Sequence, residues 1–133
     1  MYLHIHDNRT LRELQEDFNF RFPYLRIEFY SKPHHRNAAS PDTHKLNPFL
    51  QIVAVRGHHR NGAAEIHEGE TVAGFEQMMQ RDYSLPVQVF HFTKTGWILT
   101  DVTDKATLRE LNEQGKEEAH EFYNVYAQVK NLQ

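Results

Sequence analysis

The sequence predicts an α+β fold of tandem βαββ repeats, with a mixed, largely antiparallel sheet, helices on one face of it, and a C-terminal helix. Three observations favour this class. The segment IHDNRT, which starts at Ile5, is echoed by IHEGET, which starts at Ile66. Helically spaced apolar residues follow each threonine: Leu11, Leu14, Phe18 and Phe22 in one half, and Val72, Phe75, Met79 and Tyr83 in the other. A strand-like alternating run then closes each segment, LRIEFYS and VQVFHF.

The individual elements follow from local signals. Alternation and apolar runs predict strands at residues 2–6, 25–31, 47–56, 63–67, 87–92 and 97–102. Capping boxes at Thr10–Glu13 and Thr107–Glu110 predict the starts of two helices, and Thr71 opens a third. The Asn61-Gly62 pair predicts a hairpin, residues 31–46 a long surface loop, and Gly115 a break or kink in the last helix.

Length and composition predict one domain over residues 1–133. It comprises a first repeat (1–57), a second repeat (62–103) and a C-terminal helical segment (104–133), because units of about 60 residues are marginal alone. The chain has no long apolar run, no signal-peptide pattern and no cysteine. We therefore expect a cytoplasmic protein with no membrane contact.

Charge is unevenly distributed. The net charge of −3 argues against general DNA binding, yet residues 31–60 hold five basic residues, one acidic residue and five of the ten histidines. This segment predicts a site for an anionic ligand, RNA or an acidic partner. Its candidate residues are His34, His35, Arg36, Lys45, Arg56, His58, His59 and Arg60.

A second candidate site uses histidines of the strands. His4 and His6 share one side of the first strand, and His67 is the repeat counterpart of His6. If an internal twofold axis brought the halves together, these three with Glu65 and His91 could bind a divalent metal. The simpler alternative is that the histidines end strands and bond near helix starts. No cofactor is predicted beyond this possible metal.

An arrangement of tandem βαβ-type modules with a metal between them resembles the architecture of the vicinal oxygen chelate, or glyoxalase-like, proteins. That resemblance is architectural and implies a small metal-dependent enzyme. The chain has one strand fewer per half and lacks the His…Glu…His…Glu spacing, so no residue role is carried over. Separately, the run VQVFHFTKTGWILTDVTDKATLRELNEQG from Val87 resembles an uncharacterised family of small bacterial α+β proteins, which implies no activity.

Three functional hypotheses remain. The leading one is a non-catalytic binding module of a bacterial cytoplasmic protein, which contacts a partner protein or a second copy of itself. The others are the metal-dependent enzyme and the binder of RNA or an anionic ligand. No nucleophile elbow or phosphate-binding glycine loop is present, so no catalytic residue is assigned. In the C-terminal helix, Ala119, Phe122, Tyr126 and Val129 share one face, which we expect to dock on the body.

Overall fold

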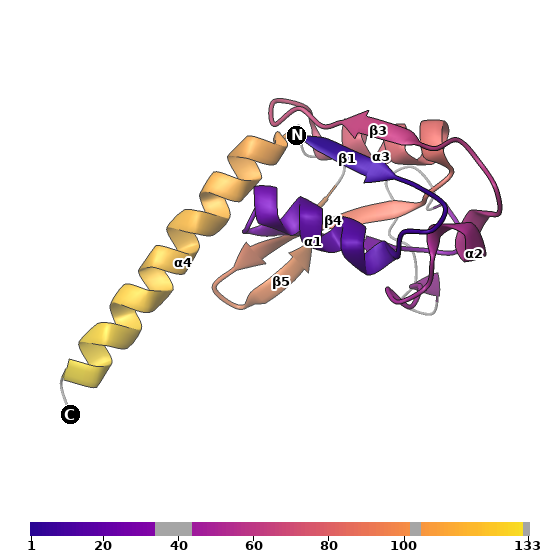
Figure 1. The fold of residues 1–133 in the computed structure, drawn as a ribbon. Helices are drawn as coiled ribbons and strands as arrows, with labels where there is room; N and C mark the ends of the chain where they lie inside the picture. Colours follow the sequence, from indigo (N-terminus) through magenta and orange to yellow (C-terminus); the bar gives the residue numbers. More distant parts are fainter. Residues whose placement is uncertain (34–43, 102–104, 132–133) are drawn as a thin grey trace.

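The computed structural model describes residues 1–33, 44–101 and 105–131. The predicted α+β class is confirmed (Figure 1). In chain order the elements are β1 (Tyr2–Ile5), α1 (Leu11–Arg21), β2 (Leu25–Phe29), α2 (Ile52–Arg56), β3 (Gly62–Glu65), α3 (Val72–Tyr83), β4 (Val87–Thr93), β5 (Gly96–Leu99) and α4 (Leu108–Asn131).

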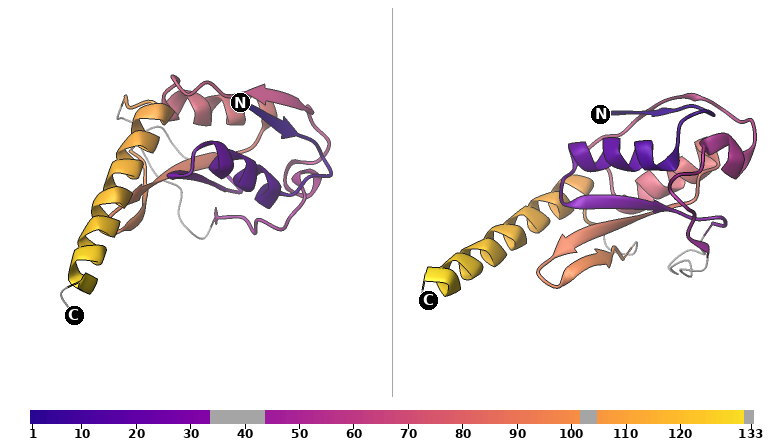
Figure 2. Two further views of the ribbon diagram at one scale, coloured as in Figure 1. Left: turned by 60° about the vertical axis from the view of Figure 1, so that its left-hand side comes forward. Right: turned by 60° about the horizontal axis from the view of Figure 1, so that its bottom comes forward.

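The strands form two antiparallel sheets. β1 pairs with β3, and β4 lies between β2 and β5. Helices α1 and α3 lie between the β1–β3 ribbon and the three-stranded sheet, as the right-hand view of Figure 2 shows. The expected single sheet is therefore wrong: each β-α-β step carries the chain from one sheet to the other. Helices α1 and α3 do lie on one face of the larger sheet.

The apolar faces predicted for α1 and α3 form the core. All eight predicted residues are buried, and the rings of Phe18 and Phe75 stack with centroids 5.2 Å apart. Leu3 and Ile5 of β1 cover the core from one side, while Ile27 and Val89 close it from the other. Burying these side chains on several elements is the main stabilising contribution to the fold.

Helix caps follow the sequence prediction. The Thr10 hydroxyl accepts from the Glu13 backbone N–H at 3.2 Å, and the Glu13 carboxylate accepts from the Thr10 N–H at 3.0 Å. The Thr71 hydroxyl accepts from Gly74 N–H at 3.1 Å in the same position of α3. These side chains satisfy N–H groups that a helix start leaves unpaired.

The strand predicted at residues 47–56 is wrong, since this segment forms turns followed by α2. Its carbonyl groups cap α1: Leu11 N–H donates to Leu50 O at 3.0 Å, and Arg12 N–H donates to Pro48 O at 2.7 Å. A continuous apolar run does not distinguish a strand from a short buried helix. The hairpin predicted at Asn61-Gly62 is also wrong, because α2 replaces its first strand.

The pairing registers relate the two halves about an approximate twofold axis. Leu3 pairs with Ala64 and Ile27 pairs with Val89, and each pair joins residues at matching places in the two halves. The starts of α2 and α4 are held by corresponding bonds: Ile52 N to Arg9 O, Val53 N to Asp7 O, Leu108 N to Glu70 O, and Arg109 N to Glu68 O. The common order is therefore strand, helix, strand, helix, with β5 added in the second half. The expected βαββ order is present in the second half, as β3, α3, β4 and β5, whereas in the first half α2 takes the place of the last strand.

Candidate interaction surface

The C-terminal helix α4 is docked on the body over its first three turns. Its start is capped by Thr107, whose hydroxyl accepts from Glu110 N–H at 3.1 Å. Leu108 and Leu111 belong to the core, and Ala119 is buried. The Asn112 side-chain oxygen accepts from the Tyr24 N–H at 2.9 Å, which ties the helix to the chain just before β2. These contacts fix the direction in which α4 leaves the body.

Gly115 permits the closest approach of α4 to the body. A Cβ atom at this position would lie 2.6 Å from the Tyr24 Cβ, closer than two carbon atoms can pack. The helix continues through Gly115 to Asn131, so the predicted break is wrong. The glycine is explained by packing, not by helix termination.

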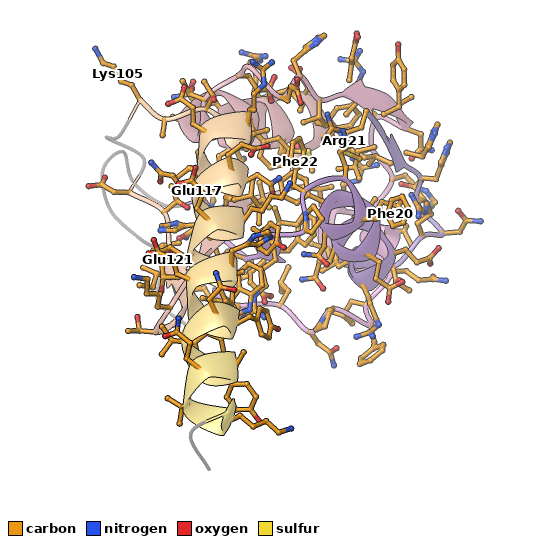
Figure 3. All side chains as sticks on the ribbon, turned by 90° about the vertical axis from the view of Figure 1, so that its left-hand side faces the viewer. Phe20, Arg21, Phe22, Lys105, Glu117 and Glu121 are labelled. Atoms are coloured by element: carbon orange, nitrogen blue, oxygen red, sulfur yellow. The ribbon has the colours of Figure 1, made fainter. Side chains whose placement is uncertain are left out.

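Beyond Ala119 the helix leaves the body. Every side chain from His120 to Lys130 is exposed, and Figures 1 and 2 show this end of α4 extending away from the other elements. Figure 3 shows α4 from the side. Glu117 and Glu121 lie on α4, and Phe20 lies on the separate helix α1. Glu121 pairs with Lys94 at the β4–β5 turn. The expected docking of the whole apolar face is therefore wrong beyond Ala119.

The exposed end carries an apolar stripe. We call Phe122, Val125, Tyr126 and Val129 the interaction stripe; their exposed fractions run from 48% to 60%. Spacings of three and four residues place them on one side of the helix. Leu108, Gly115, Phe122 and Val129 recur every seven residues, close to two helical turns. The interaction stripe is thus the continuation of the face that α4 buries against the body.

Charge is sparse around the interaction stripe. Residues 122–131 contain one charged side chain, Lys130, whereas residues 110–121 contain five glutamates. Tyr123, which lies beside the stripe, contacts the Phe122 ring with centroids 5.6 Å apart. Aromatic enrichment and few charges are typical of the centre of a protein interface.

The basic segment predicted as an anion site is only partly assembled. The side chain of Arg56 is buried and donates to Tyr83 O at 2.6 Å, to Asp7 Oδ1 at 3.3 Å and to Asn61 Oδ1 at 3.2 Å. Its charge lies at the C-terminus of α3, where a cation is favourable. The guanidinium thus holds the ends of β1 and α3 together and presents little surface to a ligand.

The neighbouring basic residues are exposed around this junction. His58 Nδ1 lies 2.9 Å from Asp7 Oδ2, and His59 Nε2 lies 3.3 Å from Ser84 Oγ. Arg60 lies over the Tyr83 ring, 5.7 Å from its centroid. The hydrogen bond with His58, aided by Arg56, lowers the pKa of Asp7 below its usual range. The carboxylate and the hydroxyl contact different histidines, so these groups do not form a nucleophile–base–acid chain.

Lys45 lies away from this group, with its ammonium 5.5 Å from the centroid of the Phe90 ring on the larger sheet. His34, His35 and Arg36 lie outside the described residues. Of the eight residues of the predicted anion site, those at positions 56 and 58–60 lie near one another, around the junction of β1 and α3.

The predicted metal ligands are not brought together. His4, His6, Glu65 and His67 are exposed on the β1–β3 ribbon, whereas His91 is on β4, with Nδ1 2.8 Å from Thr100 Oγ1. The twofold axis passes through the Leu3–Ala64 pair of an antiparallel ribbon, so His6 and His67 lie at opposite ends, roughly 20 Å apart. His67 contacts Glu65 at 3.6 Å. In residues 1–33, 44–101 and 105–131, no three His, Cys, Asp or Glu side chains are grouped to hold a metal ion.

Aromatic side chains also gather on the outer face of the larger sheet. Phe92 contacts Trp97 and Tyr24, with ring centroids 5.7 and 6.1 Å apart, and Arg26 lies 4.7 Å from the centroid of Trp97. The rings pack edge to face, and the arginine lies over the indole in a cation–π contact.

Comparisons with protein-family models, with curated proteins and with solved structures found no match. Neither the glyoxalase-like resemblance nor the small bacterial family gains support from them. Among the described helices, none is both long and apolar enough to cross a membrane. The interaction stripe was missed from the sequence because its spacing is the same as that of a docked helix face.

Proposed function

We propose that this protein is a non-catalytic interaction module that binds a protein partner through the interaction stripe. The observation that carries the proposal is the single face of α4, which is buried as far as Ala119 and exposed from Phe122 onward. An exposed helix end gains little from an apolar face in water. Binding to a partner would give that face the same role that Leu108 and Leu111 have inside the molecule.

Burial of the interaction stripe would contribute favourably to association. Full burial of a Val, Phe or similar side chain contributes about 1.5–3 kcal/mol, and these four are each about half exposed. Removing the remainder from water would contribute several kcal/mol before the entropic cost of association. This suits a reversible contact that a few aromatic side chains dominate.

The described residues give less support to the other two hypotheses. The predicted metal ligands are divided between two sheets and two ends of a ribbon, and Arg56 is occupied by protein acceptors. The interaction stripe, in contrast, is one contiguous surface on one element.

A photo-crosslinking amino acid in place of Tyr126 tests the proposal in the native cells. We expect a discrete cross-linked product from position 126, and none from Asn124, which lies on the opposite side of α4. Equal labelling from both positions, or none from either, would show that the interaction stripe is not a binding surface. Circular dichroism of both purified variants controls for folding.

A further inference from the structure

We infer that the occupant of the interaction stripe is the same stripe of a second copy of this chain, in an antiparallel helix pair. The inference rests on the proposed function and names its partner. It places Val125 and Tyr126 of both copies at a twofold axis. Phe122 of one copy then lies beside Val129 of the other.

Self-complementarity supports a second copy. The interaction stripe is apolar along its whole length, and the only charge in residues 122–131 is Lys130, near its far end. Two such segments can therefore align without bringing like charges together at the centre. A closed twofold contact also uses one patch on each copy and leaves no free complement that would continue into a fibre.

The position of the body selects the antiparallel orientation. The body lies on the same side of α4 as the interaction stripe, because Leu108 and Leu111 face it and share the stripe's heptad spacing. In a parallel pair, each body would occupy the space needed by the first turns of the other α4. In an antiparallel pair only the free ends overlap, and the bodies lie at opposite ends, as the extension of α4 in Figure 1 allows.

The overlap sets the strength of the contact. Ten residues, 122–131, span about 15 Å of helix. Each aromatic side chain can bury 150–250 Å² in full, so the four half-exposed aromatic side chains of two copies would remove roughly 300–500 Å² from water. The four half-exposed valines would add roughly 100–250 Å². The total area is typical of weak, reversible contacts. We therefore expect a dimer that dissociates on dilution.

Sedimentation of the full chain over a wide concentration range measures the association. We expect a monomer–dimer equilibrium that Val125→Glu weakens by about tenfold or more, because its carboxylate would be buried without a partner. Asn124→Glu adds the same charge on the opposite side of α4 and is expected to leave the equilibrium unchanged. A wild-type chain that remains monomeric throughout, or equal effects of both variants, would overturn the inference.

Engineered cysteines test the orientation, since the chain contains none of its own. In an antiparallel pair, Val125→Cys lies near the axis and forms a disulfide with its own copy under mild oxidation, whereas Val129→Cys does not. Mixing Phe122→Cys with Val129→Cys chains is expected to give the mixed disulfide. Self-linking of Val129→Cys would indicate a parallel pair and overturn the inference. A monomeric protein that still cross-links from position 126 to another protein would overturn self-association and leave the proposed function standing.

Discussion

Gly115 illustrates how a single residue positions the candidate interaction surface. In an exposed helix, replacing glycine by alanine stabilises by about 1 kcal/mol, because alanine has the higher helix propensity. At Gly115 the new Cβ would meet Tyr24 at 2.6 Å, so α4 or Tyr24 must move. The packing therefore opposes the propensity.

We expect Gly115→Ala to destabilise the protein by about 1–3 kcal/mol, the usual cost of overpacking. Urea denaturation monitored by circular dichroism measures this. Gly69→Ala is the matched control, since a Cβ there meets no atom within 4 Å. A gain in stability for Gly115→Ala would mean that α4 does not pack against Tyr24 as described.

The carboxylate of Asp7 makes a pH-dependent contribution. Its pKa is lowered by the hydrogen bond with His58 and by Arg56, so folding favours the ionised form. This stabilisation is fully present above the unfolded-state pKa of about 4 and is lost as pH falls through the lower pKa of the folded state.

We expect the stability of Asp7→Asn to fall less steeply than that of the wild type as the solution is acidified below about pH 4. At neutral pH the variant is less stable, because buried Arg56 loses its charged partner. Denaturation at a series of pH values measures both effects. Asp17→Asn is the comparison, because Asp17 pairs with Arg9, whose side chain is less buried than that of Arg56. Parallel pH profiles for Asp7→Asn and the wild type would contradict the assignment.

At the scale of elements, helix caps and apolar spacing were predictable and strand partners were not. Thr10, Thr71 and Thr107 begin helices as expected, because capping depends on residues three positions apart. Strand pairing depends on contacts between distant segments. The alternation of β1 and β2 gave no indication that they belong to different sheets.

Two of the errors of local interpretation, the strand at residues 47–56 and the docking of the whole α4 face, have one physical cause. An apolar run indicates that a segment is buried but does not indicate which other segment packs against it. Residues 47–56 are apolar because Ile52 enters the core, and their backbone caps α1 instead of pairing in a sheet. Phe122 and Val129 continue a docked face in sequence, but the body ends before them. The apolar face of α4 could be predicted from the sequence. The exposure of its end could not.

The cap of α4 gives a prediction at this scale. We expect Thr107→Ala to cost about 1 kcal/mol of stability, because the Glu110 N–H loses the hydroxyl that it donates to at 3.1 Å. Thr107→Ser keeps an accepting hydroxyl and should retain most of the stability. Thermal denaturation of the two variants provides the measurement, and equal losses would indicate that the methyl group matters and the cap does not.

At the scale of the whole molecule, the two halves form the body and α4 extends from it. The approximate twofold axis explains why His6 and His67 are separated, since counterparts near the middle of an antiparallel ribbon meet while those at its ends diverge. It also relates the five-residue α2 to the start of the much longer α4. The first half ends its helix at Gly57, whereas the second half extends it beyond the body and exposes the interaction stripe.

Amide hydrogen exchange of residues 122–131 tests this account most directly. If the interaction stripes of two copies cover each other, these amides are protected at high protein concentration and lose protection on dilution, while those of residues 108–119 stay protected. Val125→Glu should abolish the concentration dependence. Fast exchange of residues 122–131 at every concentration, in the wild type as in Val125→Glu, would contradict the account.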